Sequence, residues 1–338
     1  MKVVYLNRPG NLEIRDMPAP IPGEGEILVR IKAALTCGTD LKAFLRGHPM
    51  VPMPGVFGHE FAGTVEETGK GARKFRPGDE VMSVHTAPCR ACRYCAKKLY
   101  NLCENIMSTK VLGAFGEYIL IPRHIVSQNV FIKPDRLSFE EAALLEPLAC
   151  VVHGMRGLKI KKGDSVLIIG AGPIGLLHLL VATQKGARVM MTGLEHERLR
   201  IAERLGAGET VAPSILSDSV KAFTKGIGFD FVFECTGQLA VWETAVNYVR
   251  RGGTVILFGG CKQGTVVTYD TYRIHYDEIT LKGIFHFSPA DVKAAYELLG
   301  SGTIDVKPLI SGSYRLDKIR EPFEKLSRGE GIKFAIIP

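Results

Sequence analysis

The chain has 338 residues, of which 46% are hydrophobic and 23% are charged. This length accommodates two domains, each with its own core, and the composition is that of a globular protein. No stretch approaches the roughly 18 uninterrupted apolar residues of a membrane span, and the N-terminal apolar run is too short for a signal peptide. We therefore expect a cytoplasmic location and no membrane partner.

The net charge is +8, from 43 Lys plus Arg against 35 Asp plus Glu. The basic residues are scattered, so they indicate a mildly basic surface that attracts anionic ligands. No nucleic-acid recognition motif accompanies them, and we expect no nucleic-acid partner. Eight cysteines in a chain of this size without a secretion signal are more typical of reduced thiols and metal ligands than of a disulfide framework.

Short β-strands are expected through about the first 130 residues, where apolar and polar positions alternate between turns marked by Pro and Gly. The segments with this pattern are 3–5, 27–31, 61–65, 80–84, 117–121 and 130–132. Ser138 and Glu141 then form a capping box, which predicts that a helix begins there.

Strands and helices alternate from Lys162 onward. The predicted strands are 165–169, 188–192, 210–212, 231–234, 254–258 and 279–284, with helices at 173–184 and 197–205 among them. Six strands with helical crossovers predict an α/β fold, a doubly wound parallel sheet that follows the mainly β first part. The tail from Ser288 contains an amphipathic helix (291–299) and then short strands, and we expect it to rejoin the first domain.

A glycine-rich loop follows the first strand of this alternation. Gly170, Gly172 and Gly175 fit G-x-G-x-x-G directly after an apolar strand and before a helix. The three glycines permit a tight turn, close approach to a pyrophosphate and close helix–strand packing. The helix N-terminus adds free N–H groups for the phosphates. The loop predicts a dinucleotide site, and its further candidate residues are Pro173, Ile174 and Thr236.

The end of the second strand decides between NAD and NADP, because an acidic residue there binds the ribose 2′-hydroxyl whereas a 2′-phosphate needs space and an Arg. Gly193 stands at this position, Glu195 follows two residues later, and Arg198 lies beyond it. The acids Glu195 and Glu197 would repel a 2′-phosphate, which favours NAD and leaves NADP open. As surface charges, the same residues would only cap a helix.

The stretch from Cys37 to Glu60 concentrates side chains that bind Zn²⁺. It begins with Cys37-Gly38-Thr39-Asp40 and ends with Gly58-His59-Glu60. A loop rich in Gly and Pro separates the two ends and lets Cys37 approach His59. Thiolate, imidazole and carboxylate groups suit zinc, so we expect an open, catalytic zinc site. Taken alone, the stretch fits equally well a buried Cys, a satisfied His and a solvated Glu.

Four clustered cysteines give the most specific metal signal in the chain. They are Cys89, Cys92, Cys95 and Cys103. Four thiolates at short spacing close a tetrahedron around zinc with no open position, which predicts a structural site. An iron–sulfur cluster and two disulfides are the alternatives.

Glu146, before Pro147 near the expected domain joint, is a candidate carboxylate for the catalytic zinc, although on its own it would be an ordinary helix-end Glu.

Together, these motifs resemble the zinc-dependent medium-chain dehydrogenase/reductase superfamily over essentially the whole chain. Residues 146–149, Glu-Pro-Leu-Ala, are similar to the sorbitol (polyol) and threonine dehydrogenase branch. The resemblance implies a GroES-like catalytic domain at 1–150 with a structural zinc lobe at 89–103. It further implies a Rossmann dinucleotide-binding domain at 151–286 and a return to the catalytic domain at 287–338.

The resemblance also implies a role for each site residue. Cys37 and His59 would bind the catalytic zinc, with Glu60 and Glu146 as direct or adjacent ligands. Thr39 would hydrogen-bond the substrate hydroxyl and start a proton relay, and Asp40 would orient His59. Two positions depart from the family pattern: Lys42 replaces a relay His, and Gly193 replaces the NAD-binding acid.

The implied function is a zinc-dependent oxidoreductase that transfers a hydride between a secondary alcohol and a nicotinamide cofactor. The expected substrate is a small polyol, cyclitol or sugar alcohol, and the expected assembly is a homodimer or homotetramer. Dehydrogenation of threonine, another amino alcohol or a sugar phosphate is the alternative within the same superfamily. A zinc-free quinone reductase and a non-catalytic nucleotide-binding redox sensor fit the metal-ligand residues less well.

Overall fold

The computed structural model describes residues 1–338, which divide into two compact units. Unit 1 contains Met1–Cys150, Phe287–Gly302 and Val306–Pro338, and unit 2 contains Val151–His286 together with Thr303–Asp305. The chain therefore builds most of unit 1, then unit 2, and returns to unit 1 for its last segment. No helix combines the length and the apolar character needed to cross a membrane.

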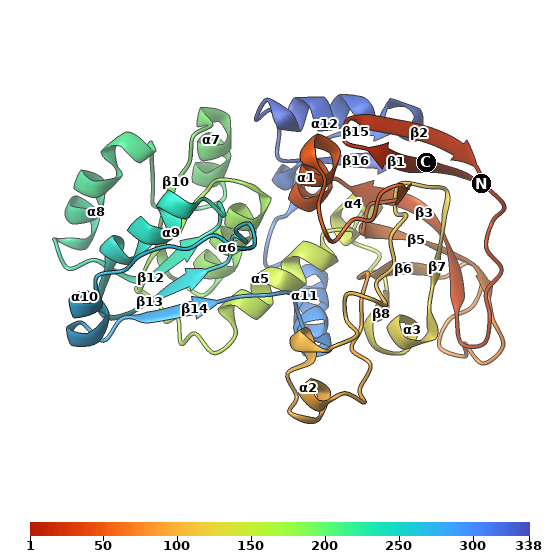
Figure 1. The fold of residues 1–338 in the computed structure, drawn as a ribbon, viewed down its shortest axis with the longest axis horizontal. Coiled ribbons are helices and arrows are strands. Elements are labelled where there is room, and N and C mark those ends of the chain that lie inside the picture. Colours follow the sequence, from red (N-terminus) through yellow and green to blue (C-terminus); the bar gives the residue numbers. More distant parts are fainter. The chain divides into compact units, whose positions relative to one another are not determined.

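Unit 1 is mainly β, as the alternating pattern predicted. One sheet has the order β15-β16-β3-β5-β6-β8, with β7 also paired to β3, and a smaller sheet has the order β2-β1-β4 (Figure 1). Their bounds are β1 (Lys2–Arg8), β2 (Asn11–Asp16), β3 (Ile27–Leu35), β4 (Gly55–Val56), β5 (Glu60–Thr68), β6 (Glu80–Ser83), β7 (Tyr118–Ile121), β8 (Val130–Ile132), β15 (Ile310–Arg315) and β16 (Lys333–Ile337). The last strand of the chain thus lies beside β3.

Helices join and flank these strands. They are α1 (Gly38–Arg46), α2 (Arg93–Ala96), α3 (Arg123–Asn129), α4 (Phe139–Ala142), α5 (Leu145–Met155), α11 (Pro289–Ser301) and α12 (Arg320–Ser327). The capping box predicted before α4 is confirmed, because Glu141 N–H donates to Ser138 Oγ at 3.2 Å and Ser138 N–H donates to Glu141 Oε2 at 2.8 Å. The helix begins directly after Ser138 for this reason.

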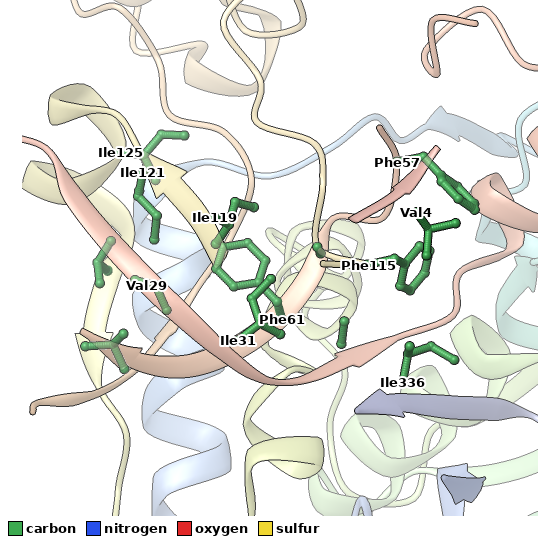
Figure 2. Packing of buried hydrophobic residues seen from close by; sticks show 14 of the residues in the cluster. Val4, Val29, Ile31, Phe57, Phe61, Phe115, Ile119, Ile121, Ile125 and Ile336 are labelled. Carbon is green, nitrogen blue, oxygen red and sulfur yellow. The ribbon is translucent and has the colours of Figure 1, made fainter. Parts of the chain in front are cut away.

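The core of unit 1 is a cluster of β-branched and aromatic side chains from several strands (Figure 2). Phe57 and Phe115 meet edge to face with ring centroids 4.9 Å apart, and Phe323 of α12 lies 5.8 Å from Phe57. Aromatic pairs in this geometry add stabilisation beyond the area they bury. The cluster fixes residues 57–61, which carry two of the candidate metal ligands.

Unit 2 is a six-stranded parallel sheet in the order β11-β10-β9-β12-β13-β14, with helical crossovers (Figure 1). The strands are β9 (Ser165–Ile169), β10 (Arg188–Thr192), β11 (Glu209–Val211), β12 (Phe229–Glu234), β13 (Val249–Leu257) and β14 (Thr280–Gly283). The helices are α6 (Pro173–Gln184), α7 (His196–Arg204), α8 (Leu216–Thr224), α9 (Leu239–Ala245) and α10 (Thr271–Tyr276). The predicted doubly wound sheet is confirmed.

One strand boundary differs clearly from the sequence expectation. β13 begins at Val249 rather than Thr254, because buried Val249 pairs with Phe229 of β12. Two arginines and two glycines follow Val249, and their low strand propensity hid the start of the strand. Arg250 nevertheless binds this end of the sheet through a 2.7 Å hydrogen bond to Asp230.

Candidate functional site

Asp40 connects the two ends of the predicted zinc stretch. Cys37 precedes α1 as its N-cap residue, and its N–H donates to Asp40 Oδ2 at 3.3 Å. The other oxygen of this fully buried carboxylate lies 3.3 Å from Nδ1 of His59. One side chain therefore sets the position of both the thiol and the imidazole, and it leaves Nε2 of His59 available to a metal.

The conformation before His59 requires glycine. Gly58 has φ +88°, and a Cβ at this position would lie 2.7 Å from the ring of Phe115. Glycine alone avoids both the strained backbone and the clash. His59 itself is buried. Burial by itself would lower the pKa of His59, but Asp40 and Cys37 outweigh it and raise that pKa well above its usual value.

Adjacent strands bring the candidate ligands together. Cys37 follows β3, Glu60 opens β5, and the two strands pair with Leu35 opposite Glu60. The ligand atoms of Cys37, His59 and Glu60 all lie within 4.8 Å of one another. A thiol, an imidazole and a carboxylate at this separation fit a zinc ion with three protein ligands and an open position.

Lys333 completes this cluster, and sequence reasoning missed it. It is the first residue of β16, it is 1% exposed, and its Nζ lies 2.6 and 2.9 Å from the two oxygens of Glu60. The same ammonium donates to the carbonyl of Thr36 at 2.7 Å. Burial raises the pKa of Glu60, and Lys333 opposes that rise. Burial alone would lower the pKa of Lys333, but Glu60 and Cys37 raise that pKa overall.

Glu146 lies beside Cys37, His59 and Glu60 but is not one of these three closely spaced ligands. It is buried in α5, 3.4 Å from His85 Nδ1 and 3.9 Å from Cys150 Sγ. The rings of His85 and His59 are 4.9 Å apart, which connects the two groups. Burial is the main cause that raises the pKa of Glu146 to about 7. His85 and Cys150 were not among the predicted site residues, since neither lies in a recognisable motif.

Thr39 and Lys42 both lie in α1, after Cys37. Thr39 is in its first turn and is half-buried, and Lys42 is half-buried one turn further. The proton-relay position that carries a His in the family pattern is therefore occupied by a cation on the same helix. His48, after the end of α1, has its pKa lowered by burial first and by Lys42 second.

The four clustered cysteines converge as predicted. The Sγ atoms of Cys89, Cys92, Cys95 and Cys103 all lie within 4.8 Å of one another, and none is in a disulfide. Backbone N–H groups of residues 91 and 92 lower the pKa of Cys89 to about 6, whereas burial raises that of Cys95 to about 12. Four thiols at this separation fit a closed tetrahedral zinc site.

The glycine-rich loop has the predicted form. Gly170 has φ +113°, and a Cβ at Gly175 would lie 1.9 Å from the carbonyl oxygen of Gly170, so both positions require glycine. Gly172 is the N-cap of α6 and has open space around it, which leaves its backbone accessible to a phosphate. Pro173 is the first residue of α6, and the carbonyl of Ile174 bonds His178 Nδ1 at 2.9 Å.

The end of β10 has no space for a side chain. A Cβ at Gly193 would lie 2.6 Å from Cβ of Ala171, so the loop itself excludes an acid at this position. Glu195 is the N-cap of α7, and Arg198 lies 3.7 Å from its carboxylate. Thr236 follows β12, and its methyl group is 3.0 Å from where a Cβ on Gly170 would lie.

Two family models match the chain. Residues 23–133 match the alcohol dehydrogenase GroES-like domain, and residues 173–301 match the zinc-binding dehydrogenase model. The chain is 33% identical to D-arabitol-phosphate dehydrogenase of Enterococcus avium, over 99% of this chain and 97% of that protein. It is 30% identical to sorbitol dehydrogenase of Bacillus subtilis (100% and 97%) and to L-threonine 3-dehydrogenase of Rhizobium etli (95% and 94%).

Solved structures agree with these matches. A zinc-binding dehydrogenase of Sinorhizobium meliloti bound to NADP superposes with a TM-score of 0.90 at 32% identity, over 100% of this chain and 99% of that one. The 2R,3R-butanediol dehydrogenase of Bacillus subtilis superposes with a TM-score of 0.89 at 27% identity, also over 100% and 99%. The similarity therefore extends over both units.

Proposed function

Because the chain belongs to the zinc-binding dehydrogenase family, we propose that it reversibly oxidises a secondary alcohol to a ketone, with a nicotinamide dinucleotide as hydride acceptor. The observation that carries this proposal is the convergence of Cys37, His59 and Glu60 in unit 1. The substrates proposed first are polyols, cyclitols and sugar alcohols, in line with the similarity to sorbitol dehydrogenases.

In this proposal Cys37, His59 and Glu60 hold the catalytic zinc, and Glu146 lies next to it. Zinc bound there supplies Lewis acidity, which lowers the pKa of an alcohol hydroxyl. Asp40 keeps His59 in one tautomer and one orientation through its 3.3 Å contact with Nδ1. Lys333 balances the negative charge of Glu60 in a buried environment, where an uncompensated carboxylate would be costly.

The remaining steps use side chains of α1 and the loop of unit 2. The hydroxyl of Thr39 would accept the hydroxyl proton of the substrate while it donates its own proton to solvent water. Residue 42 is Lys42 and not the His of the family pattern, so the relay differs from that pattern at this position. Gly170, Gly172 and Gly175 hold the pyrophosphate of the dinucleotide at the start of α6, where free N–H groups point outward. A nicotinamide bound there would supply the acceptor for the hydride of the carbinol carbon.

We propose NAD as the principal acceptor. Its support is the negative charge of Glu195 and Glu197 close to the expected ribose position. Arg198 is the feature that favours NADP, although its pairing with Glu195 offsets part of its charge. Comparing kcat/KM for NAD and NADP in the wild type and in Arg198→Ala tests this assignment, since an NADP-selective enzyme would contradict it.

The decisive experiment is an assay with a panel of substrates, followed by the absorbance of the reduced nicotinamide. Sorbitol, xylitol, inositol, 2,3-butanediol and threonine are offered with each cofactor to protein whose zinc content has been measured. We expect turnover with at least one polyol, and kcat/KM lower on the order of a thousandfold in a Cys37→Ala variant. Zinc-loaded protein that turns over no member of the panel would contradict the polyol proposal.

A phosphorylated polyol is the second candidate. The similarity to D-arabitol-phosphate dehydrogenase and the net charge of +8 both favour an anionic substrate. Adding D-arabitol phosphate to the panel separates the two candidates, because a phosphate-specific enzyme would have a KM that rises steeply with salt concentration.

The two carboxylates are distinguished by zinc content. Glu60 lies in the tight group with Cys37 and His59, whereas Glu146 lies beside it. Glu60→Gln should therefore weaken zinc binding more than Glu146→Gln does. The reverse order would assign the direct contact to Glu146.

The same proposal includes a structural zinc, a location and an assembly. Cys89, Cys92, Cys95 and Cys103 would hold the second zinc. All eight cysteines are free, which supports a reducing compartment such as the cytoplasm.

β14 is an edge strand, and Tyr272 and Tyr276 near it are largely exposed, which supports a homodimer or homotetramer formed at this edge. Light scattering of the purified protein tests the assembly.

A further inference from the structure

A buried carboxylate lies at the carboxyl end of β12, and the function proposed above gives it no role. Glu234 is the last residue of β12 and is 0% exposed. β12 lies next to β9 on the side opposite β10, so the strand order reverses between β9 and β12. In doubly wound sheets a dinucleotide binds across the carboxyl ends of the strands at this reversal.

Glu234 holds two separate segments of unit 2. Its Oε1 accepts hydrogen bonds from Thr236 N–H at 2.6 Å and Gly237 N–H at 3.0 Å, and also from the hydroxyl of Thr236. Its backbone carbonyl accepts from the N–H groups of Phe258 and Gly259, each at 3.0 Å. The turn after β12 and the segment after β13 are thus both fixed by one residue.

The packing around this carboxylate leaves no space for a different arrangement. A Cβ at Gly259 would lie 2.2 Å from the nitrogen of Gly237 and 2.7 Å from Oε2 of Glu234. The indole N–H of Trp242 donates to the carbonyl of Gly259 at 2.8 Å and closes the arrangement from α9. The carboxylate therefore fixes the 235–237 turn, whereas the segment after β13 is held through the backbone carbonyl of Glu234 and the indole of Trp242.

This geometry extends to the glycine-rich loop. The N–H of Cys235 donates to the carbonyl of Ile169, the last residue of β9, at 2.9 Å. The methyl group of Thr236 lies 3.0 Å from where a Cβ on Gly170 would be. The turn at 235–237 therefore forms the wall of the loop on the β12 side, which in this fold is the side of the second mononucleotide, here the nicotinamide half.

Two N–H groups and a hydroxyl converge on the buried carboxylate of Glu234. Burial raises the pKa of Glu234, and the hydrogen bonds from Thr236 and Gly237 only partly offset that rise. A buried acid with a perturbed pKa and several donors aimed at it, at the carboxyl end of a strand where the order reverses, is a candidate for a functional role.

We propose that Glu234 is a positioning residue for the cofactor, which holds Thr236 and the 235–237 turn in the place where the nicotinamide half of the dinucleotide binds. This inference rests on the proposed function, because it requires that unit 2 binds a nicotinamide dinucleotide. The adenosine half would bind on the β10 side, where Glu234 makes no contact.

The test compares how tightly the zinc-loaded protein binds two ligands, the reduced dinucleotide and ADP-ribose. Gln in place of Glu234 keeps Oε1 as an acceptor, but it removes the charge and places an NH₂ donor where Oε2 faces the N–H of Gly237 at 3.3 Å, so the turn is held less firmly. We expect Glu234→Gln to weaken binding of the reduced dinucleotide about tenfold, the size of one lost hydrogen bond to a charged group. ADP-ribose, which lacks nicotinamide, should bind within about twofold of wild type. Trp242 is the only Trp in the chain and bonds this region directly, so its fluorescence reports both titrations.

Glu243→Gln is the matched control. Glu243 lies on α9 and accepts from the N–H and hydroxyl of Thr268 at 2.9 and 3.2 Å, away from the loop, so its variant should bind both ligands like wild type. Thr236→Val, which removes one donor and keeps the side-chain shape, is a second variant in case Glu234→Gln does not fold, and it should lower dinucleotide binding in the same direction.

Each outcome decides one question. A wild type that binds neither NADH nor NADPH contradicts the proposed function itself. Wild-type binding with an equal loss of both ligands in Glu234→Gln, or with no loss of either, overturns the positioning role. Loss of the dinucleotide alone, with the Glu243→Gln variant unaffected, supports it.

Discussion

The two candidate metal centres of unit 1 are built in opposite ways. The four cysteines between Cys89 and Cys103 belong to one continuous segment and offer four identical donors. The other centre has three different donors from separate places: Cys37 after β3, and His59 and Glu60 where β5 begins. Its supporting Lys333 comes from β16. One centre is therefore encoded locally, whereas the other exists only once the sheet has formed.

The difference shows how chemistry divides between the two centres. Four thiolates satisfy zinc completely and leave no position for a substrate, so such a site stabilises a fold. A thiol, an imidazole and a carboxylate leave one position open, and the supporting hydrogen bonds must then fix each ligand separately. Asp40 and Lys333 provide these contacts in the assembled centre, through His59 and Glu60.

The largest expected effect follows from removing the thiol of the assembled centre. Cys37→Ala should lower kcat/KM on the order of a thousandfold, because Lewis-acid assistance contributes several kcal/mol to such reactions. Zinc per chain, measured by plasma mass spectrometry, should fall by about one equivalent, with the four-cysteine site still occupied. Full retention of both zinc ions would show that Cys37 is not a ligand.

The next effect tests the buried charge pair. Lys333→Met should lower the free energy of unfolding by about 3 kcal/mol, since it leaves the carboxylate of Glu60 buried without its partner. The double variant with Glu60→Gln should regain most of this loss. Lys318→Met, which breaks an exposed pair with Glu321, should change stability by less than about 0.5 kcal/mol in the same urea titration. If Lys333→Met and Lys318→Met lowered the free energy of unfolding equally, the proposed role of Lys333 would be contradicted.

The same contrast explains what the sequence could reveal. The spacing of the four cysteines and the G-x-G-x-x-G loop are local patterns, and the structure has both in the predicted geometry. Lys333 is 273 residues away from Glu60 in the chain, and a Lys in a strand near the C-terminus carries no local signal of a buried partner. Only the pairing of β16 with β3 brings it to the site.

The fold, too, could be predicted where its signal is local in the sequence and not where it depends on distant residues. The βα alternation of unit 2 depends on hydrophobic periodicity, which is local, so strand and helix positions were found to within a few residues. The start of β13 was wrong because Val249 is separated from the apolar part of its strand by Arg and Gly, and only its pairing with Phe229 reveals it. Glu234 was predicted as the end of a strand, and its hydrogen bonds to the following turn appear only in three dimensions.

A smaller effect is expected from the residue that links the ligands. Asp40→Asn keeps an oxygen for the N–H of Cys37, but its amide group cannot accept from both that N–H and His59 as the carboxylate does. Activity or zinc affinity should fall by about 10- to 100-fold, the usual result of losing a carboxylate that orients a metal-bound His. Added zinc should partly restore the activity. A variant with wild-type zinc affinity and kcat/KM would mean that Asp40 only caps α1.

The smallest effect on turnover is expected at the locally encoded centre. Cys103→Ser removes a buried thiol from the four-cysteine group, so zinc should again fall by about one equivalent, this time with the catalytic ion retained. The midpoint of thermal unfolding should fall by roughly 10 °C, because structural zinc contributes directly to folding. Folded molecules should keep kcat within about twofold of wild type, since a closed site has no position for a substrate. Cys37→Ala and Cys103→Ser thus lose the same amount of metal with opposite consequences. If Cys103→Ser instead abolished turnover while the protein stayed folded, the division between a structural and a catalytic centre would be wrong.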